Sequence, residues 1–271
     1  RYDDFGFRVG FQQFSDALLN GLVGWWKFDE TNGTVAYDSS GNGNDGVVNG
    51  ASLVIGHDGT PNSAYEFNSS NNDFIDIPNE FANGADYNSY TFRLIFKYNQ
   101  DGDYTLWNKD GNWKEIAIKI ETGNKIRMGW AYPGGYQHIA SELNAISPNT
   151  WNDVMIISDN GLVEMYVNGN KLSNYSINTI TSGMIGFSHS GSCGINYGYN
   201  RFGFTKTSCQ PRHYLEGKLS EFAIWTRALT TQEIQQLYSG SASYTYSWSP
   251  AGETTSSINV SPASTTTYTV D

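Results

Sequence analysis

The stretch Glu115–Trp130 reads EIAIKIETGNKIRMGW: two runs of alternating apolar and polar residues separated by Glu121-Thr-Gly-Asn124. Alternation with a period of two is typical of a β-strand that buries one face, and a glycine-containing turn between two such runs predicts a hairpin. The same alternation recurs in Tyr90–Phe96 and in Asp153–Ile157. Short alternating runs separated by turn signals predict an all-β sandwich.

One stretch indicates a helix. Thr230 offers a capping hydroxyl, and Glu233 follows three residues later, which is the capping-box arrangement. The apolar residues Ile234 and Leu237 come next, and Gly240 can end the helix. The sequence therefore predicts one short helix that closes the sandwich near its C-terminal end.

Composition limits the classes of partner. The chain has 271 residues, 38% of them hydrophobic and 15% aromatic, which is enough to pack a core. A net charge of -11 with only 16 Lys and Arg residues argues against nucleic acid and anionic membranes, which need a basic surface. No run approaches the roughly 18 apolar residues of a membrane span, so we expect no membrane insertion. Residues 1–20 lack a signal-peptide pattern, and any export signal is expected outside this sequence.

The chain divides into three segments by composition. Residues 21–240 contain the alternating runs, residues 1–20 form an N-terminal flank, and residues 241–271 are rich in Ser and Thr with alternation in Tyr244–Trp248 and Thr267–Val270. The last segment is too small to bury a core of its own. One hypothesis is that terminal strands add to neighbouring subunits or domains.

Five blocks in order carry a family resemblance: Gly21–Glu30 (GLVGWWKFDE), Tyr37–Gly46 (YDSSGNGNDG), Tyr65–Phe67 with Phe74–Ile77, Trp151 with Met165–Gly169 (MYVNG), and Gly217–Leu229 (GKLSEFAIWTRAL). With these blocks, residues 21–240 resemble the laminin-G-like, concanavalin A-like jelly-roll domains of exported bacterial proteins. The resemblance implies a concanavalin A-like jelly-roll sandwich with one short C-terminal helix, in a secreted or cell-surface protein.

The flanks resemble other domains. Tyr2–Gly10 resembles the closing strand of a formylglycine-generating-enzyme-like domain, and Tyr246–Val260 with Thr266–Val270 resembles an immunoglobulin-like repeat of bacterial surface proteins. These resemblances imply a fragment of a longer modular protein, with residues 241–271 as a partial immunoglobulin-like β segment.

The turn Asp38-Ser-Ser-Gly-Asn-Gly-Asn-Asp-Gly46 is rich in oxygen ligands. In the resembled family this turn and the strand before the C-terminal helix meet around calcium, which binds six to eight oxygens. The resemblance implies carboxylate ligands at Asp38 and Glu221, carbonyl ligands at Gly43 and Asn44, and a side-chain oxygen from Asn42 or Asn44. The alternative is a turn without metal, since Asp, Asn and Gly favour turns in any case.

A second candidate site is aromatic. Flat rings interleaved with Asn108, Asp110, Asn112 and Gln137 suit a sugar, whose C–H face stacks on rings while its hydroxyls pair with polar groups. The alternative is that many of these rings belong to the core or the rim. The aromatic candidates are Trp107, Trp113, Trp130, Tyr132, Tyr136 and His138.

Cys193 and Cys209 flank a loop rich in Gly, Tyr and Asn, with no residue between them spaced for zinc. A disulfide is the better interpretation, and it favours export because disulfides persist in oxidising compartments.

Catalytic patterns are missing from the sequence. Jelly-roll glycosidases carry a Glu-x-Asp-x-x-Glu strand, which does not occur here, and Gln137 and His138 are adjacent, so a strand would point them to opposite faces. The leading hypothesis is a non-catalytic carbohydrate-binding or adhesion module, stabilised by calcium, whose partner is a glycan or another cell-surface ligand. The alternatives are a structural module that joins subunits or domains by strand addition, and a polysaccharide lyase or glycoside hydrolase with a divergent site.

Overall fold

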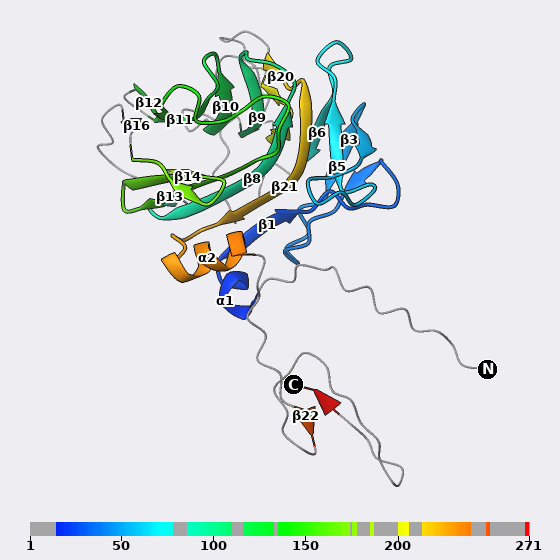
Figure 1. Ribbon diagram of the computed structural model, residues 1–271, viewed down its shortest axis with the longest axis vertical. Helices are drawn as coiled ribbons and strands as arrows, with labels where there is room; N and C mark the ends of the chain where they lie inside the picture. The colour runs from blue at the N-terminus through cyan, green and yellow to red at the C-terminus, as the bar shows by residue number, and fades with distance from the viewer. Residues whose placement is uncertain are drawn as a thin grey trace, which may run out of the picture.

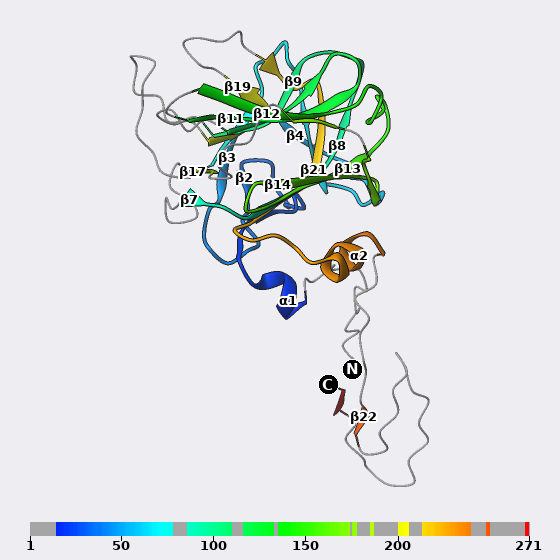
Figure 2. The same ribbon diagram turned by 90° about the vertical axis from the view of Figure 1, so that its left-hand side faces the viewer.

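A computed structural model describes residues 15–77, 86–109, 116–132, 135–173, 175–177, 185–186, 200–205, 213–239, 248–249 and 269–270. Two large antiparallel sheets face each other across a hydrophobic core (Figure 1, Figure 2). The predicted all-β sandwich with a short C-terminal helix is confirmed. Within the described residues, no helix is long and apolar enough to cross a membrane.

Sheet A has eight strands. Neighbours in this sheet are often distant in sequence, as in other sandwiches with Greek-key connections. Its order is β15 (Asn170–Lys171), β14 (Leu162–Val167), β13 (Asn152–Asp159), β8 (Tyr90–Tyr98), β21 (Gly217–Trp225), β5 (Ala64–Phe67) and β4 (Ser52–Val54), and β1 (Leu22–Trp26) also pairs with β21.

Sheet B has nine strands and includes the hairpin predicted from Glu115–Trp130. Residues pair from Ile116 opposite Trp130 to Glu121 opposite Lys125, which confirms that hairpin. The order of sheet B is β16 (Tyr175–Ile177), β12 (Gly135–Ser141), β11 (Lys125–Tyr132), β10 (Ile116–Glu121), β9 (Tyr104–Lys109), β18 (Asn200–Phe202), β6 (Phe74–Ile77), β3 (Gly46–Asn49) and β2 (Val35–Ala36).

Three short pairs complete the described strands: β7 (Asp86–Tyr87) with β17 (Ile185–Gly186), β19 (Phe204–Thr205) with β20 (His213–Tyr214), and β22 (Trp248–Ser249) with β23 (Thr269–Val270). Most of the flanks 1–20 and 241–271 lies outside the described residues. Their predicted domain relationships stay predictions.

The core between the sheets is rich in aromatic rings. Phe202 of sheet B and Phe222 of sheet A lie 4.9 Å apart between ring centroids, and Trp26 packs edge-on against Phe202 at 5.3 Å. All three side chains are fully buried. Burying side chains of this size contributes roughly 1.5–3 kcal/mol each, and edge-to-face pairs add to that. The core therefore fixes how the two sheets face each other.

Helices cover part of the outer face of sheet A (Figure 1, Figure 2). They are α2 (Thr231–Ser239) and α1 (Asp16–Leu19). The predicted capping box is confirmed, because the Thr230 amide donates to Glu233 Oε2 at 2.7 Å and the Glu233 amide donates to Thr230 Oγ1 at 3.3 Å. The helix α1 was not predicted from the sequence. A second apolar cluster, which includes Trp225 and Leu237, fills the space between the helices and the sheet.

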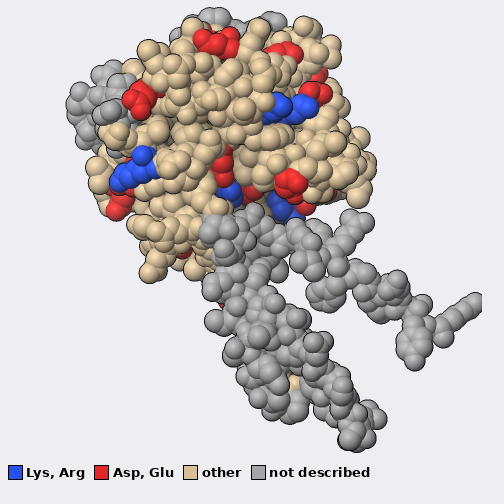
Figure 3. All heavy atoms as spheres, in the orientation of Figure 1, with Lys and Arg blue, Asp and Glu red and all other residues tan. Residues whose placement is uncertain are grey.

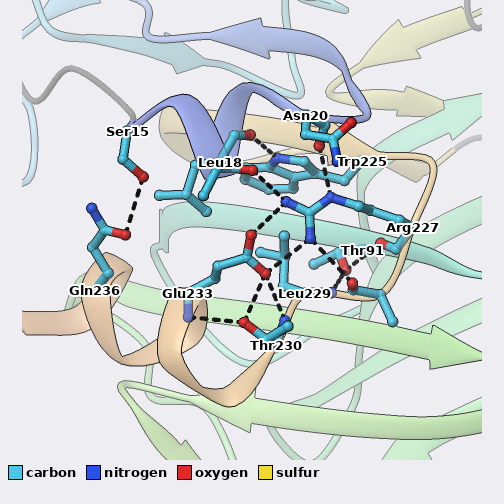
Figure 4. Close-up of polar contacts among 12 residues, drawn as sticks. Ser15, Leu18, Asn20, Thr91, Trp225, Arg227, Leu229, Thr230, Glu233 and Gln236 are labelled. Carbon is cyan, nitrogen blue, oxygen red and sulfur yellow. Dashed lines mark hydrogen bonds and ion pairs between the residues drawn. The ribbon is translucent and has the colours of Figure 1, made fainter.

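Arg227 ties the two helices together (Figure 4). Its guanidinium donates to the carbonyl oxygens of Ala17 and Asn20, both at 2.7 Å, and forms an ion pair with Glu233 at 2.6 Å. The indole of Trp225 donates to the carbonyl oxygen of Leu18 at 2.6 Å. These bonds satisfy carbonyl groups of the very short helix α1. The helices thus cover the part of the outer face of sheet A where Ala223 and Trp225 lie.

Glu30, in the loop after β1, is an unusually buried carboxyl group. The residue is 5% exposed, its Oε1 accepts the amide of Tyr37 at 2.8 Å, and the hydroxyl of Tyr65 lies close enough to affect its pKa. Burial raises the pKa of Glu30 from its ordinary value of 4.5 to about 7, against the lowering effect of the Tyr37 hydrogen bond. Ionised Glu30 is therefore costly in the folded protein.

This carboxyl group predicts that stability falls as the pH rises. Between the unfolded pKa and the folded pKa, the folded state holds a proton that the unfolded state has lost, so each pH unit costs the folded state about 1.4 kcal/mol. The loss begins near pH 4.5 and is complete above about pH 7. We expect Glu30→Gln, which keeps the acceptor for Tyr37 but cannot ionise, to gain about 3 kcal/mol on the wild type across this window.

Denaturant unfolding across the same pH window measures this gain. Glu142→Gln is the matched control, because Glu142 is exposed. A Glu30→Gln effect of constant size at every pH would contradict the prediction.

Candidate functional site

Asp38 of the oxygen-rich turn is engaged by four N–H donors. Its Oδ1 accepts the amides of Trp25 and Ser40, both at 2.9 Å. Its Oδ2 accepts the amide and the side-chain Nδ2 of Asn44, both at 3.0 Å. An ionised carboxylate has about four acceptor sites, so these donors saturate it.

The other turn residues predicted as ligands also bond within the protein. Asn44 is 7% exposed, its carbonyl accepts the indole of Trp26 at 3.0 Å, and its Nδ2 also donates to the carbonyl of Val23 at 2.9 Å. The Nδ2 of Asn42 donates to the carbonyl of Leu22 at 3.0 Å. Gly43 has a φ of 76°, a conformation that favours glycine. The side-chain amides of Asn42 and Asn44 therefore hold the turn against β1.

Glu221 already has a cation beside it. Its Oε1 accepts the indole of Trp25 at 3.1 Å and pairs with Arg93 at 3.2 Å, and Arg93 also pairs with Asp153 at 2.7 Å. No group of three or more His, Cys, Asp or Glu side chains in the described part of the chain is placed to hold a metal ion. The bonds of these residues therefore agree better with a turn that binds no metal than with a calcium site. Calcium binding stays a prediction.

Trp107 was predicted as a sugar-binding ring, and that prediction is wrong. It is fully buried in the core, where its ring lies 5.4 Å from the rings of Phe92 and Phe222. The physical reason is a register shift between β9 and β10: Trp107 stands opposite the buried Ile118, whereas Thr105 stands opposite Lys119. A bulge of this kind changes which side chains share a face.

The other aromatic candidates are only partly described. Trp113 lies outside the described residues, as do Cys193 and Cys209, whose disulfide stays a prediction. The backbones of Trp130 and Tyr132 lie in β11 and that of Tyr136 in β12, but their side chains are not described. Of the six predicted residues, His138 alone has a described side chain that is not fully buried.

A line of polar and small residues crosses the outer face of sheet B. Residues directly opposite one another on paired strands share a face of the sheet. Their immediate neighbours, such as Ile75, Phe202, Ile118 and Met128, belong to the core, so this line faces outward. We call it the transverse row; in order it comprises Asp76, Arg201, Asn108, Ala117, Gly129 and His138.

Polar groups lie at both ends of the transverse row. Arg201 forms a two-pronged ion pair with Asp76, and its guanidinium lies 4.3 Å from the ring centre of Phe74. Asn108 is 1% exposed, and its Oδ1 has no hydrogen-bond partner among the described residues. An unpaired buried carbonyl of this kind costs about 1–3 kcal/mol, which marks it as a group that stability alone does not explain.

Cationic side chains flank the His138 end. The neighbouring row places Lys119 opposite Arg127, and Arg127 pairs with Glu121. The pKa of His138 is lowered, first by burial and then by the positive charge of Arg127. His138 is therefore neutral at neutral pH and can both donate and accept hydrogen bonds.

Only part of the transverse row could be predicted from sequence patterns. The alternation in Phe74–Ile77 places Asp76 on the face opposite Ile75 and Ile77, so its outward position was predictable. The pairing of Arg201 with Asn108 joins strands more than 90 residues apart. No local pattern predicts such a pairing.

Comparison with known proteins identifies the family. A laminin G family model described as "Concanavalin A-like lectin/glucanases superfamily" matches residues 67–235, more than half of the chain. No curated protein matches the chain in sequence.

Several solved structures share the fold. The chain is 14% identical to the binding domain of botulinum neurotoxin DC in complex with rat synaptotagmin II, with a TM-score of 0.57, and the match covers 81% of this chain and 52% of that one. It is 16% identical to a Trypanosoma rangeli sialidase in complex with sialic acid, with a TM-score of 0.52, covering 80% and 32%.

A third similar structure is domain 4 of the extracellular arabinanase AbnA from Geobacillus stearothermophilus in complex with arabinotriose. The identity is 18% and the TM-score 0.53, and the match covers 80% of this chain and 98% of that domain. The chain thus spans about a third of the sialidase and half of the neurotoxin chain, but nearly all of the arabinanase domain. At these identities the likeness shows the fold. The family match and the two-sheet sandwich together place the chain in the concanavalin A-like lectin/glucanases superfamily, to which it belongs as a laminin G-type domain.

Proposed function

We propose that this chain is a non-catalytic carbohydrate-binding module and that its binding surface is the transverse row of sheet B. One observation carries the proposal: the buried Asn108 amide, with its unpaired Oδ1, lies between the Arg201–Asp76 ion pair and the small residues Ala117 and Gly129. A buried acceptor without a partner is suited to a ligand that supplies a hydrogen-bond donor.

The shape and chemistry of the row fit a sugar. Asn108, Ala117 and Gly129 in the middle of the row are buried, whereas Asp76 and His138 at its two ends are partly exposed. Ala117 and Gly129 carry little or no side chain, and Asn108 and His138 stand on either side of them. Sugar hydroxyls both donate and accept hydrogen bonds, as do a side-chain amide and a neutral imidazole. A low apolar floor with a few fixed polar groups is the usual composition of a small-ligand site.

The part of the outer face of sheet A that lies under the two helices offers no comparable site. There α1 and α2 pack against Met155, Ala223 and Trp225, and Arg227 fastens the helices in place (Figure 4). A ligand would have to displace this second apolar cluster to reach the sheet.

The charge of the protein argues against a nucleic-acid partner and leaves a glycan as a candidate. On the face seen in Figure 3, acidic and basic side chains are interspersed rather than gathered into a broad area of one sign. With a net charge of -11, the protein lacks the basic footprint of a nucleic-acid partner. Two of the similar structures hold a sugar, sialic acid in the sialidase and arabinotriose in the arabinanase domain, which supports a glycan as the ligand of this jelly roll.

Catalysis is left out of the proposal for a geometric reason. Glycoside hydrolysis uses two carboxyl groups about 5–9 Å apart that flank the scissile bond. The transverse row holds a single carboxylate, Asp76, and Arg201 engages both of its oxygens. Secretion or cell-surface display belongs to the same proposal, on the strength of the resemblance to exported jelly rolls and of the Cys193 and Cys209 pair.

The first test of the proposal is a glycan array. We expect the folded wild type to bind, and Asn108→Ala and His138→Ala each to weaken binding about tenfold, since a lost hydrogen bond to a ligand costs roughly 1–1.5 kcal/mol. Asn170→Ala, on the edge strand β15 of sheet A, is the matched control and should bind as the wild type does.

Circular dichroism verifies that each variant folds. If the wild type ignores every glycan, the proposed function fails; if both variants bind like the wild type, the site lies elsewhere.

Asp38 is expected to stabilise the domain without calcium. Asp38→Ala removes the acceptor of four N–H groups, so the free energy of unfolding should fall by about 2–4 kcal/mol. Because the donors are protein amides, the loss should be equal in excess calcium and in a chelator. Denaturant unfolding under both conditions measures it. A calcium-dependent rise in wild-type stability that Asp38→Ala abolishes would instead establish the ion that the family resemblance implies.

A further inference from the structure

Part of the outer face of sheet A lies beyond the second apolar cluster under the helices. Here Lys97 stands opposite Lys218, Lys218 opposite Glu66, and Glu66 opposite Ser52. The adjacent residues Phe96, Leu219 and Tyr65 are in the core, so these polar side chains are on the outer face. None of the four belongs to the second apolar cluster. We call this surface the open half of sheet A.

An aromatic pair lies over the open half. Trp151 directly precedes β13, where Asn152 stands opposite Phe96, so Trp151 is at the end of the sheet near Lys97. Its side chain is partly exposed, and its ring lies 6.3 Å from the ring of His57 at an angle of 74°. The His57 residue itself is exposed.

Ser220 holds the His57 ring in one orientation. His57 Nδ1 lies 2.8 Å from Ser220 Oγ, and the His57 backbone amide donates to the same oxygen at 3.2 Å. The Ser220 hydroxyl donates its one hydrogen to the carbonyl oxygen of Ser63 at 2.8 Å. Nδ1 must therefore be the donor, so neutral His57 carries its proton on Nδ1 and presents Nε2 as a hydrogen-bond acceptor.

The local backbone is shaped to bring these groups together. Ser220 is the extra residue of a bulge in β21, because Leu219 stands opposite Phe96 and Glu221 opposite Ile95. Gly56 permits the close approach of the His57 loop, since a Cβ there would lie 2.1 Å from Ser63 Oγ, 2.5 Å from the Ser63 carbonyl oxygen and 2.9 Å from Ser220 Oγ. Bulges next to binding sites commonly re-aim a side chain in this way.

The charges around the aromatic pair are balanced. Lys218 pairs with Glu66 at 3.3 Å. The carboxylate of Asp58, next to His57, accepts hydrogen bonds from Thr60 at 2.9 and 2.7 Å, and so faces its own loop. Lys97 follows Phe96, which stands opposite Asn152, so the register places Lys97 near Trp151. This surface offers a ring, an acceptor and donors without a strong excess of either charge.

We infer that the open half of sheet A is a second carbohydrate site, which takes a neutral hexopyranose. The C–H face of the sugar stacks on Trp151, one hydroxyl donates to Nε2 of His57, and another accepts from Lys97. A sugar suits this set because it combines an apolar face with hydroxyls that both donate and accept. This site does not depend on the transverse row, which lies on the opposite side of the sandwich.

The test uses ¹⁹F NMR of protein labelled with 5-fluorotryptophan, with the Trp151 signal assigned from Trp151→Phe. Neutral oligosaccharides, such as cellobiose, lactose and maltose, should shift this signal, and the shift should persist in high salt. His57→Ala should weaken the titration about tenfold, the loss of one hydrogen bond. Asn170→Ala, an exposed residue on the edge strand β15, is the control and should titrate like the wild type. If Trp151→Phe does not fold, the signal is assigned from its displacement in His57→Ala.

Three results would overturn the inference. They are a Trp151 signal that no neutral oligosaccharide moves, a His57→Ala variant that titrates like the wild type, and a response confined to acidic sugars that salt abolishes. A Trp151 response that persists while Asn108→Ala and His138→Ala leave array binding unchanged would reject the transverse row and keep this site. The reverse pattern would reject this site and keep the transverse row.

Discussion

The change of partner along one edge of strand β21 is the constraint on which the rest of the structure depends. On one edge β21 pairs with β8 along its length, whereas on the other its first residues pair with β5 and its last residues with β1. The bulge at Ser220 lies where the partner changes. Because β1 comes from the start of the domain and β21 from its end, this one strand closes the sandwich and brings α1 next to α2 (Figure 1).

The same bulge divides the outer face of sheet A into two halves with different chemistry. Beyond it, Ala223 and Trp225 lie under the helices; before it, Lys218 lies on the open half. The buried ion triad of Arg93, Glu221 and Asp153 stands between the two halves, with the ring of Tyr238 from α2 at 5.9 Å from Arg93. Buried ion pairs add little net stability, but removing one partner is costly. The triad therefore lies at the boundary between the helix-covered half and the open half.

Local sequence patterns predicted the elements whose formation depends on residues a few positions apart. Period-two alternation located the hairpin of β10 and β11, and the capping box at Thr230 located α2, because strand faces and helix caps depend on residues a few positions apart. The helix α1 has four residues and is stabilised by contacts with Arg227 and Trp225, more than 200 residues away. A helix this short has no periodicity to detect.

The candidate sites were harder to predict because the same residue types can serve in two different structures. An aromatic ring in an alternating strand is as apt for the core as for a sugar, and the bulge beside Ile118 decided that Trp107 faces inward. At Asp38 the same oxygens serve a cation or amides, and the fold supplies four N–H donors from β1 and the turn. Outcomes of this kind depend on register and long-range pairing, which amino-acid composition does not contain.

The positions of the two proposed surfaces have a consequence for binding. Packed sheets lie about 10 Å apart, and outward side chains extend the distance between their outer faces further. A single glycan chain cannot reach the transverse row and the open half at once without passing around the edge of the sandwich. Two sites on one ligand raise avidity only where the geometry permits simultaneous engagement. On these two proposals, the opposed sites suit the joining of two separate glycans rather than the holding of one glycan chain at both sites.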